Sequence, residues 1–587
     1  MIKQFLQQAA EGRCVFITDV REAFQTGGAR PFHLHVTLYD RSIRVFPLLL
    51  PETAGEDEKQ FAAEYVYASV YNLLSALGGR RVDIYLDRTD REAAELAEGL
   101  GQVFQLETEK TARTGYGRCL NVNERVLAAL FGKEEKFAFG VHDVKEEPAA
   151  QPPKAVEGQP VFARLPALTK GKMVLGMDIG GTDVKLAVSV DGQLALCKEF
   201  DWLPAACTRA EEITAPLLLL TRLLRGAGSL YRAGREAEID RAALGKHASM
   251  AEMERGAAAM ERCAGAQLRQ FDAIGLCFPD VVIQNRIVGG ETHKTLGLRN
   301  NPETRYEEQF AKITALNEAL SAYVAEGGPV MNTNDGPMAA FAAAVEQAAA
   351  GGDLSKGFFA HTLGTDLGTG WVRPDGSIPE LPLEVYNFII DLGAARRKLA
   401  AEDVRSVRSF NTGLPGALQR YTGQSGVFRL AAENLPRQAP ELWEELLRRG
   451  LFRWEGERLT VPERPEDMRK ACLELLMEKA AAGQPACEEI FRTVGEYLAV
   501  TWRETEYVLR PETKDRTLFG RLVKLPACFH LLREGAARRE TALRQYAADG
   551  QLANTTLMRQ LDAHPDYTVA QFAQAVGAIY YGCLGLQ

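Results

Sequence analysis

The chain has 587 residues, a length that normally forms more than one domain. With 46% hydrophobic and 25% charged residues, its composition is that of a globular protein and excludes a disordered, fibrous or membrane-embedded chain. A formal net charge of −9 argues against nucleic acid as the main partner.

No apolar run is long enough for a secretory signal or a membrane span, so we expect a cytoplasmic protein without a membrane partner. The ten cysteines are scattered singly, with no C-x-x-C pair. This spacing predicts reduced thiols rather than disulfides or a zinc site.

Residues 1–145 predict a small α/β domain whose role the pattern does not indicate. Alternating apolar residues predict a β-hairpin, and helical and strand patterns follow. The predicted elements are the hairpin at 32–38 and 43–45, a helix at 61–77, a strand at 82–86 and a helix at 91–100. Prolines and the loss of apolar periodicity then predict a linker over residues 146–172.

After this linker, short apolar strands closed by glycine turns alternate with long helical patterns. This alternation predicts an α/β architecture with large helical additions. The helical patterns lie near residues 208–270, 311–326, 338–350, 428–450 and 470–508.

A first glycine turn, Gly180-Gly181-Thr182, lies between two apolar strands in residues 173–188. Glycines lack Cβ atoms and let backbone amides approach an anion closely, while the threonine adds a hydroxyl donor. Asp178, at the strand end, can hold Mg²⁺ or its water, and Lys185 can add positive charge. The alternative is a plain β-hairpin with a structural turn.

A second segment, residues 361–372, repeats the design of strand, glycine- and threonine-rich turn, and strand. Two such hairpins can clamp a triphosphate from both sides. The Walker A pattern and the dinucleotide fingerprint are both absent, which removes the main support for a mononucleotide P-loop and for a Rossmann fold. The candidate phosphate-binding residues here are Gly364, Thr365, Gly368, Thr369 and Gly370.

Between the two turns, Asn334-Asp335-Gly336 precedes the helical pattern at 338–350. Asp335 can accept the proton of an attacking hydroxyl, while Asn334 orients that substrate by hydrogen bonds. The alternative is that one of the two side chains only caps the helix.

Taken in order, these segments resemble the ROK family of sugar kinases (repressor, open reading frame, kinase). Asp178 to Thr182 resembles its first phosphate motif, Asn334 to Gly336 its catalytic motif, and Leu363 to Gly370 its second phosphate motif. Weaker similarities lie at Ala273 to Val282, where Asp280 replaces a glycine, at Gly416 to Gly426, at Thr517 to Val523, and at Ala575 to Ala578. In the third of these, Gly520 stands alone where the family has two glycines that contact adenosine.

The chain departs from the family pattern where the sugar is bound. The family's Gly-Glu-x-Gly-His segment corresponds to Leu383 to Asn387, so the resemblance makes Glu384 and Asn387 the candidate sugar ligands. They are nearly as well explained as structural residues. The family's cysteine-rich zinc loop is replaced by Ser409 to Gly416, which has no cysteine, and we expect no zinc.

The resemblance implies the two-lobe, actin-like and ribonuclease H-like ATPase fold of actin, Hsp70 and hexokinase. Lobe I would span 173–335 with a helical insertion near 205–270. Lobe II would span 336–587 with an insertion near 428–508, and the last helix returning to lobe I is an option.

The activity implied is phosphoryl transfer from ATP to a hydroxyl of a sugar or sugar-like molecule. Mg²⁺ would lie near Asp178, and Asp335 would act as the base. Neither the sugar nor the oligomeric state follows from the sequence, and a homodimer is left open.

Two other functions compete with the sugar kinase. A sugar-responsive repressor would carry an N-terminal three-helix DNA-reading module, and the strand patterns of residues 1–140 argue against one. A nucleotide-binding protein of the same fold without sugar kinase activity, either an ATPase activator or a ligand-binding scaffold, would explain the altered sugar segment.

Overall fold

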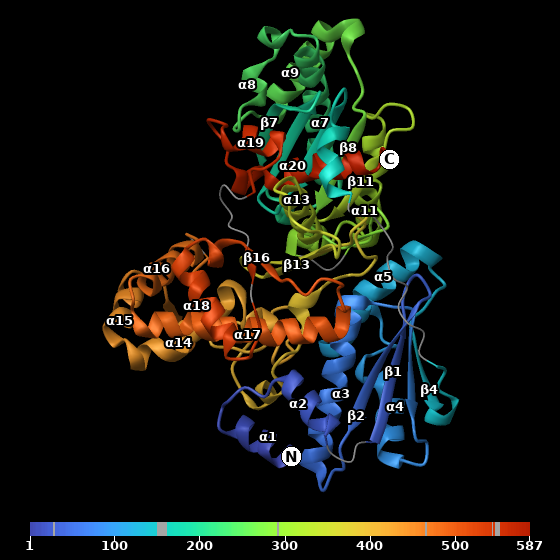
Figure 1. Cartoon of the computed structure of the whole chain (residues 1–587), viewed down its shortest axis with the longest axis vertical. Coiled ribbons are helices and arrows are strands. Elements are labelled where there is room, and N and C mark those ends of the chain that lie inside the picture. Colours follow the sequence, from blue (N-terminus) through green and yellow to red (C-terminus); the bar gives the residue numbers. More distant parts are fainter. Residues whose placement is uncertain (27–29, 150–160, 290–292, 464–465, 543, 546–551) are drawn as a thin grey trace. The chain divides into compact units, whose positions relative to one another are not determined.

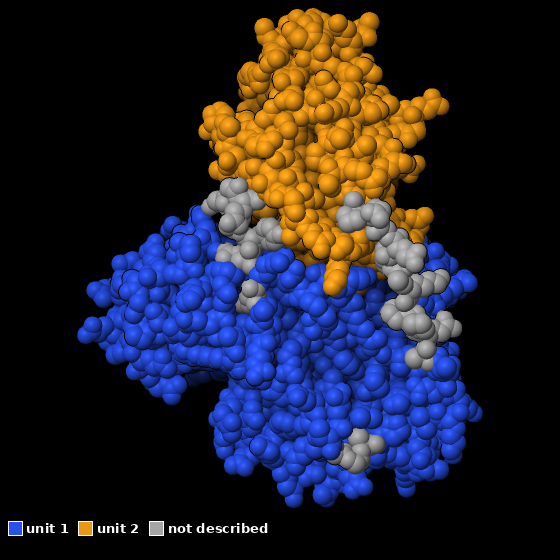
Figure 2. Space-filling model, viewed as in Figure 1, with its two compact units in different colours: residues 1–155, 361–369, 381–545 blue, residues 156–360, 370–380, 546–587 orange. Residues whose placement is uncertain are grey.

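A computed structural model describes residues 1–26, 30–149, 161–289, 293–463, 466–542, 544–545 and 552–587 (Figure 1). The chain forms two compact units (Figure 2). Unit 1 contains residues 1–155, 361–369 and 381–545, and unit 2 contains residues 156–360, 370–380 and 546–587. The domain boundaries expected from the sequence stay predictions, and residues 150–160 of the expected linker lie outside the described residues.

Unit 2 is built on a five-stranded sheet with the order β11-β8-β5-β6-β7. Strands β5, β6 and β7 form an antiparallel meander, and β8 and β11 join it as parallel strands beside β5. This order and these directions are those of a ribonuclease H-like lobe, which confirms the predicted fold class. The strands are β5 (Met173–Ile179), β6 (Asp183–Val190), β7 (Gln193–Asp201), β8 (Ala273–Phe278) and β11 (Val330–Asn334).

The last helix, α20 (Val569–Leu584), packs directly on this sheet. A Cβ at Gly176 would lie 1.9 Å from the Ala575 carbonyl oxygen, and a Cβ at Gly275 would lie 1.8 Å from that of Ala578. Glycine inside a strand therefore has a packing reason here, because it lets the helix backbone approach the sheet. Helix α13 (Asp335–Ala349) packs against α20 in turn.

The inserted helices cover the other face of the sheet. Side chains alternate along a strand, so Met173, Leu175 and Met177 point away from the face that Gly176 presents to α20. Those three residues share one buried apolar cluster with Leu220 of α7 and Met253 of α9. The predicted helices of this region are confirmed as α7 (Glu211–Arg232), α8 (Arg241–Leu244), α9 (Met250–Ala264), α11 (Tyr306–Thr314) and α12 (Leu316–Ser321).

A second sheet has the order β13-β12-β16-β17. Its strand order matches that of the first sheet, with β13, β12, β16 and β17 in the places of β6, β5, β8 and β11. Among the described residues, no strand takes the place of β7. Long helices lie between β13 and β16 in the chain and confirm the predicted helical addition. The elements are β12 (Phe358–Leu363), β13 (Leu367–Val372), α14 (Gly423–Gln438), α15 (Pro440–Arg448), α16 (Arg469–Ala481), α17 (Pro485–Leu509), β16 (Thr517–Phe519), α18 (Pro526–Ala537) and β17 (Arg544–Gln545).

The N-terminal region has its own four-stranded sheet, with the order β2-β1-β3-β4. The predicted hairpin is confirmed as β1 (Arg30–Thr37) and β2 (Ile43–Leu50), which pair antiparallel. Helix α3 (Glu56–Leu77) is buried over most of its second half and contacts α17. The remaining elements are α1 (Ile2–Ala10), α2 (Ile17–Gln25), β3 (Arg81–Leu86), α4 (Arg91–Val103), α5 (Cys119–Phe131) and β4 (Ala138–Asp143).

Within the described part of the chain, no helix combines the length and the apolar character that crossing a membrane requires.

Candidate functional site

Three strands of unit 2 end at the same edge of the sheet, because β5, β8 and β11 run parallel. Asp178 of β5 is paired with Cys277 of β8, and Asn334 of β11 is paired with Phe278. Ligands of open α/β sheets bind outside such carboxyl ends. The first glycine turn follows β5 directly and Asp335 follows β11, so the sheet brings these predicted residues to one edge.

The first glycine turn is a closed, hydrogen-bonded hairpin. The Gly180 amide donates to the Asp183 carbonyl at 2.8 Å, and the Trp202 indole donates to the Gly180 carbonyl at 3.0 Å. A Cβ at Gly180 would lie 2.7 Å from the Asp183 carbonyl oxygen, so this position needs glycine for the turn itself. The structural explanation of the turn therefore holds for Gly180, while Gly181 borders the side chain of Lys294.

The polar side chains of this turn are tied to Asp183. The Thr182 hydroxyl donates to Asp183 Oδ2 at 3.3 Å, and the Lys185 ammonium forms an ion pair with the same carboxylate. Lys185 also lowers the pKa of Asp178, which places its charge near that carboxylate.

Asp178 carries a carboxylate whose charge is poorly compensated. Its Oδ1 accepts a hydrogen bond from the Cys277 thiol at 3.2 Å, and burial raises its pKa to about 6 against the opposing effect of Lys185. A divalent cation would stabilise the charged form, so the residue fits Mg²⁺ held by one carboxylate and phosphate oxygens. No group of three or more His, Cys, Asp or Glu among the described residues could hold a metal, so most ligands would have to come from phosphate and water.

The Asn334-Asp335 pair begins α13, and Asn334 is its N-cap. Asn334 Oδ1 accepts from the Gly336 amide at 3.0 Å, and its Nδ2 donates to the Asp280 carbonyl at 2.9 Å. The capping alternative is thus observed for Asn334. Each of these groups has a second bonding position that a substrate hydroxyl can use.

Asp335 is placed differently. Its Oδ1 accepts from the Gly336 amide at 3.0 Å, its Oδ2 lies 3.5 Å from the Lys294 ammonium, and its side chain is 44% exposed. A carboxylate with this much exposure can meet an incoming hydroxyl.

Lys294 is the residue of this edge that sequence reasoning missed. Its aliphatic stem borders Gly181, with Cε 3.4 Å from the position of a Cβ there, and its Nζ reaches Asp335. It joins the glycine turn to the proposed base across more than a hundred residues of sequence. No local motif marks it, so the sequence offered no signal for it.

The second glycine turn joins β12 to β13, and its centre belongs to unit 1. The Gly364 amide donates to the Asp366 carbonyl at 3.1 Å, and the Gln424 amide donates to the Gly364 carbonyl at 3.0 Å. Gly520 adopts a φ of +94°, and a Cβ there would lie 2.4 Å from the Leu363 carbonyl oxygen. The structure therefore places Gly520 against Leu363, at the strand end that leads into the second glycine turn.

Three further predicted residues of this hairpin, Gly368, Thr369 and Gly370, have structural neighbours. The Thr369 hydroxyl lies 3.1 Å from His361 Nδ1, and Gly368 borders Thr362. Gly370 belongs to unit 2, where a Cβ would lie 2.4 Å from the Gly336 carbonyl oxygen at the start of α13. Close packing explains this glycine without a phosphate.

Glu384 precedes a short 3₁₀ turn, η9 (Val385–Asn387), and Asn387 is the last residue of that turn. The Tyr386 hydroxyl interacts with both of their side chains, and its pKa is raised far above the ordinary value by burial and then by Glu384. Asn387 Oδ1 accepts from Gln419 Nε2 at 3.3 Å. The carboxylate of Asp366, in the second glycine turn of unit 1, also raises the pKa of Tyr386.

The predicted residues thus form two sets. Asp178, Gly180, Gly181, Thr182, Lys185, Asn334, Asp335 and Gly370 belong to unit 2, while Gly364, Thr365, Gly368, Thr369, Glu384, Asn387 and Gly520 belong to unit 1. A clamp of both turns on one triphosphate stays a prediction.

No family model matches this sequence, and none of the curated proteins matches it. Among solved structures, the chain is similar to the ROK hexokinase from Thermus thermophilus, with a TM-score of 0.33 and 18% identity over 65% of this chain and 96% of that one. It is similar to a ROK family glucokinase from Streptomyces griseus in complex with glucose and AMPPNP (TM-score 0.34, 16% identity, 69% and 98% covered). A third is the inorganic polyphosphate/ATP-glucomannokinase from Arthrobacter sp. strain KM (TM-score 0.29, 12% identity, 70% and 97% covered). Such scores support no argument about activity, so the fold assignment rests on the strand order of the two sheets.

Proposed function

We propose that this protein transfers the γ-phosphoryl group of ATP to a hydroxyl of a sugar or sugar-like small molecule. The observation that supports it most is the edge of the unit 2 sheet, where Asp178, the Gly180-Gly181 turn and Asp335 meet beside Lys294. A carboxylate for a metal, a glycine turn for phosphate, a cation and an exposed carboxylate are the parts that phosphoryl transfer to an alcohol needs.

In this proposal the chain's own groups act mainly by aligning the reactants and by neutralising charge. Asp335 Oδ2 receives the proton of the attacking hydroxyl, and the Lys294 ammonium stands where negative charge of the phosphoryl group would be neutralised. Mg²⁺ beside Asp178 would neutralise phosphate oxygens. Because the transferred group passes through a loose transition state, alignment and charge neutralisation matter more than the strength of the base.

The test is sugar-dependent ADP formation by the purified full-length chain with Mg²⁺ and ATP. A panel of hexoses, amino sugars and polyols is screened, and the product is identified by mass spectrometry. We expect at least one sugar to stimulate ADP release and to gain a phosphoryl group. A chain that binds no Mg²⁺ and ATP in calorimetry would contradict the proposal.

A nucleotide-binding role without sugar kinase activity is the second candidate. Asn387 stands where the family has histidine, and its side chain is held by Gln419 and Tyr386. A side chain engaged in this way has less capacity for a sugar hydroxyl. Tight binding of Mg²⁺ and ATP, with ADP release that every sugar in the panel leaves unchanged, would favour this second function.

A further inference from the structure

The segment that carries Glu384 and Asn387, residues 381–393, has little regular structure of its own. Its helical parts are two short 3₁₀ turns, η9 (Val385–Asn387) and the start of η10 (Leu392–Arg396). Buried backbone amides and carbonyls need partners, so such a segment must take them from its surroundings. The N-terminal region supplies many of them.

Helix α3 holds the start of this segment. The amides of Leu383 and Glu384 donate to the carbonyls of Ala76 and Ser75, at 3.1 and 3.3 Å. These two carbonyls belong to the last turn of α3, whose final carbonyls have no partners within the helix. The end of α3 therefore fixes the backbone of Glu384 itself.

Asn72, one turn earlier in α3, holds the other side of the candidate ligands. Its Oδ1 accepts from the Ile389 amide at 2.8 Å, and its Nδ2 donates to the Ile389 carbonyl at 3.1 Å. Its Nδ2 also donates to Glu504, which forms a buried ion pair with Arg21. Asn72 is fully buried, so one side chain fixes both backbone groups of one residue in the segment.

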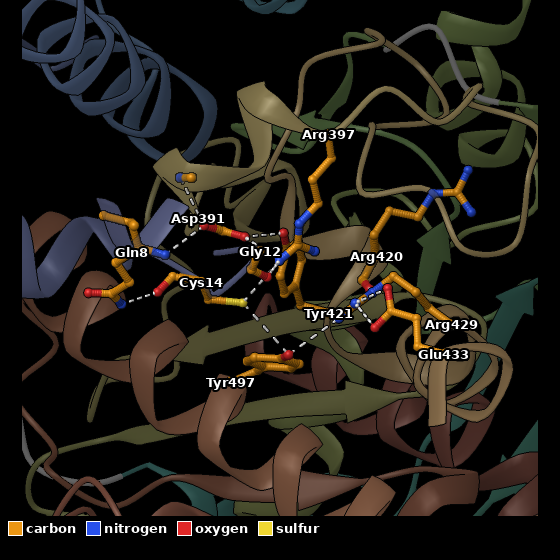
Figure 3. Close-up of polar contacts among 12 residues, drawn as sticks. Gln8, Gly12, Cys14, Asp391, Arg397, Arg420, Tyr421, Arg429, Glu433 and Tyr497 are labelled. Atoms are coloured by element: carbon orange, nitrogen blue, oxygen red, sulfur yellow. Dashed lines mark hydrogen bonds and ion pairs between the residues drawn. The ribbon is translucent and has the colours of Figure 1, made fainter. Parts of the chain in front are cut away.

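Residues 15–17 also form hydrogen bonds to this segment. The Ile17 amide donates to the Ile390 carbonyl at 3.0 Å, and the Leu392 amide donates to the Val15 carbonyl at 2.8 Å. Asp391 Oδ1 accepts from the Val15 amide. Asp391 Oδ2 accepts from the Tyr421 hydroxyl (Figure 3). The backbone is thus held on both sides of Glu384 and Asn387.

The loop that stands where the family has its zinc site is held in the same way. Arg118 of the N-terminal region donates to the Asn411 carbonyl at 2.9 Å. Gln419 links this loop to the candidate ligands, because its Oε1 accepts from the Ser409 hydroxyl and the Phe410 amide while its Nε2 donates to Asn387. Hydrogen bonds among these residues connect the loop, Asn387 and the N-terminal region.

We propose that the N-terminal region, residues 1–145, is the scaffold of the acceptor site, with Asn72 as the positioning residue for the segment that carries Glu384 and Asn387. The proposal rests on the proposed function, and it gives a role to a region whose sequence indicates none. Loops that recognise ligands are positioned by rigid elements, and recognition of a polyhydroxyl acceptor weakens when a ligand side chain shifts by an ångström. The N-terminal region acts on recognition of the acceptor and leaves ATP binding by the unit 2 edge unchanged.

The test compares Asn72→Ala with Asn121→Ala in the full-length chain. Asn121 is a matched control, because it is also a buried asparagine of the N-terminal region, and its side chain bonds to Lys110 and Arg113. For the best sugar of the panel, we expect Asn72→Ala to raise the sugar KM at least tenfold with the ATP KM within twofold. We expect amide exchange in peptides over 383–393 to become at least tenfold faster, and neither change in Asn121→Ala.

An unchanged sugar KM, an equal rise of both KM values, or an equal effect of Asn121→Ala would overturn the proposal. If Asn72→Ala does not fold, Arg118→Met is tested instead, because it removes the partly exposed donor to the Asn411 carbonyl. We expect this variant to raise the sugar KM and to speed amide exchange over 409–416. If neither changes, the proposal that the N-terminal region is the scaffold of the acceptor site is overturned. If the wild-type chain phosphorylates no sugar, the proposed function fails. Amide exchange then tests by itself whether the N-terminal region anchors residues 383–393. Unchanged exchange over 383–393 in Asn72→Ala then overturns it, and faster exchange supports it.

Discussion

Lys294 Nζ lies 3.5 Å from Asp335 Oδ2, and the stem of the same lysine borders Gly181. Gly181 belongs to the motif that the sequence predicts to bind phosphate, and Asp335 belongs to the motif predicted to meet the acceptor hydroxyl. A cation between them faces the place where the transferred group would pass. Its charge would stabilise a phosphoryl group between ATP and acceptor more than it stabilises ADP.

Substituting this lysine should therefore affect ATP more than ADP. We expect Lys294→Met to lower kcat/KM by roughly 10- to 100-fold, because a charge-assisted contact contributes about 1.5–3 kcal/mol. Calorimetry should show weaker binding of Mg²⁺ and ATP, with the affinity for ADP within a factor of about two. Lys294→Arg should recover part of the rate.

Lys312→Met is the matched control for this charge. Lys312 pairs with Glu211 at 2.6 Å, and both side chains are more than half exposed. Exposed ion pairs contribute about 0–1 kcal/mol, so this variant should resemble the wild type. Equal losses in both variants would remove the assigned role of Lys294.

The proposed base makes a second prediction. Asp335→Asn keeps the shape of the side chain and removes its capacity to take a proton. We expect transition-state stabilisation to fall by about 2–4 kcal/mol, a loss of roughly 30- to 1,000-fold in kcat, with the KM values for ATP and sugar nearly unchanged. Steady-state kinetics with the best sugar of the panel measures this. Full activity of Asp335→Asn would exclude Asp335 as the base.

The sequence predicted the local parts of this molecule well. Apolar runs around Gly180-Gly181 and around Gly364 specify two hairpins through short-range patterning, and both hairpins form. The Asn334 cap was also predictable, because an asparagine before a helical pattern is a common N-cap. Such features depend on neighbours in the chain.

Contacts between distant segments were not predictable in the same way. Lys294 has no motif around it, and only the folded unit brings it to Asp335. Asn72 lies inside a helical pattern that reads as ordinary core, and its bond to Ile389 crosses more than three hundred residues. The role of the N-terminal region follows from contacts of this second kind.

Gly520 makes a third prediction, about stability. Its φ of +94° is unfavourable for a residue with a Cβ, and that Cβ would lie 2.4 Å from the Leu363 carbonyl oxygen. We expect Gly520→Ala to lower the free energy of unfolding by more than about 1 kcal/mol and to weaken ATP binding through the displaced turn. Urea denaturation and calorimetry measure the two effects.

Gly413→Ala separates the backbone strain from the close approach. Gly413 has a φ of +71° and no heavy atom within 4 Å of a Cβ position. It shares the positive φ of Gly520 and lacks its steric conflict, so it should be the milder variant. Equal destabilisation by the two substitutions would mean that the contact with Leu363 is not what requires glycine at 520.

The last prediction concerns acid stability and His361, which lies in β12 beside Thr369 of β13. Burial and, after it, the positive charge of Arg516 together lower the pKa of His361 to about 3. In the unfolded chain a histidine has a pKa of about 6.5, so below that pH the unfolded state binds the proton that the folded state refuses. The stability that His361 contributes is therefore present above pH 6.5 and is lost as the pH falls toward 3.

The loss from this one group is about 2 kcal/mol between pH 7 and pH 5. His361→Gln cannot bind this proton, so its free energy of unfolding should fall by about 2 kcal/mol less than that of the wild type over the same interval. Urea denaturation of both proteins at the two pH values gives this difference directly, because the other titrating groups are shared. An equal fall in the free energy of unfolding of the two proteins would contradict this prediction. It would show that His361 is protonated in the folded chain, or that its surroundings in the unfolded chain keep it neutral.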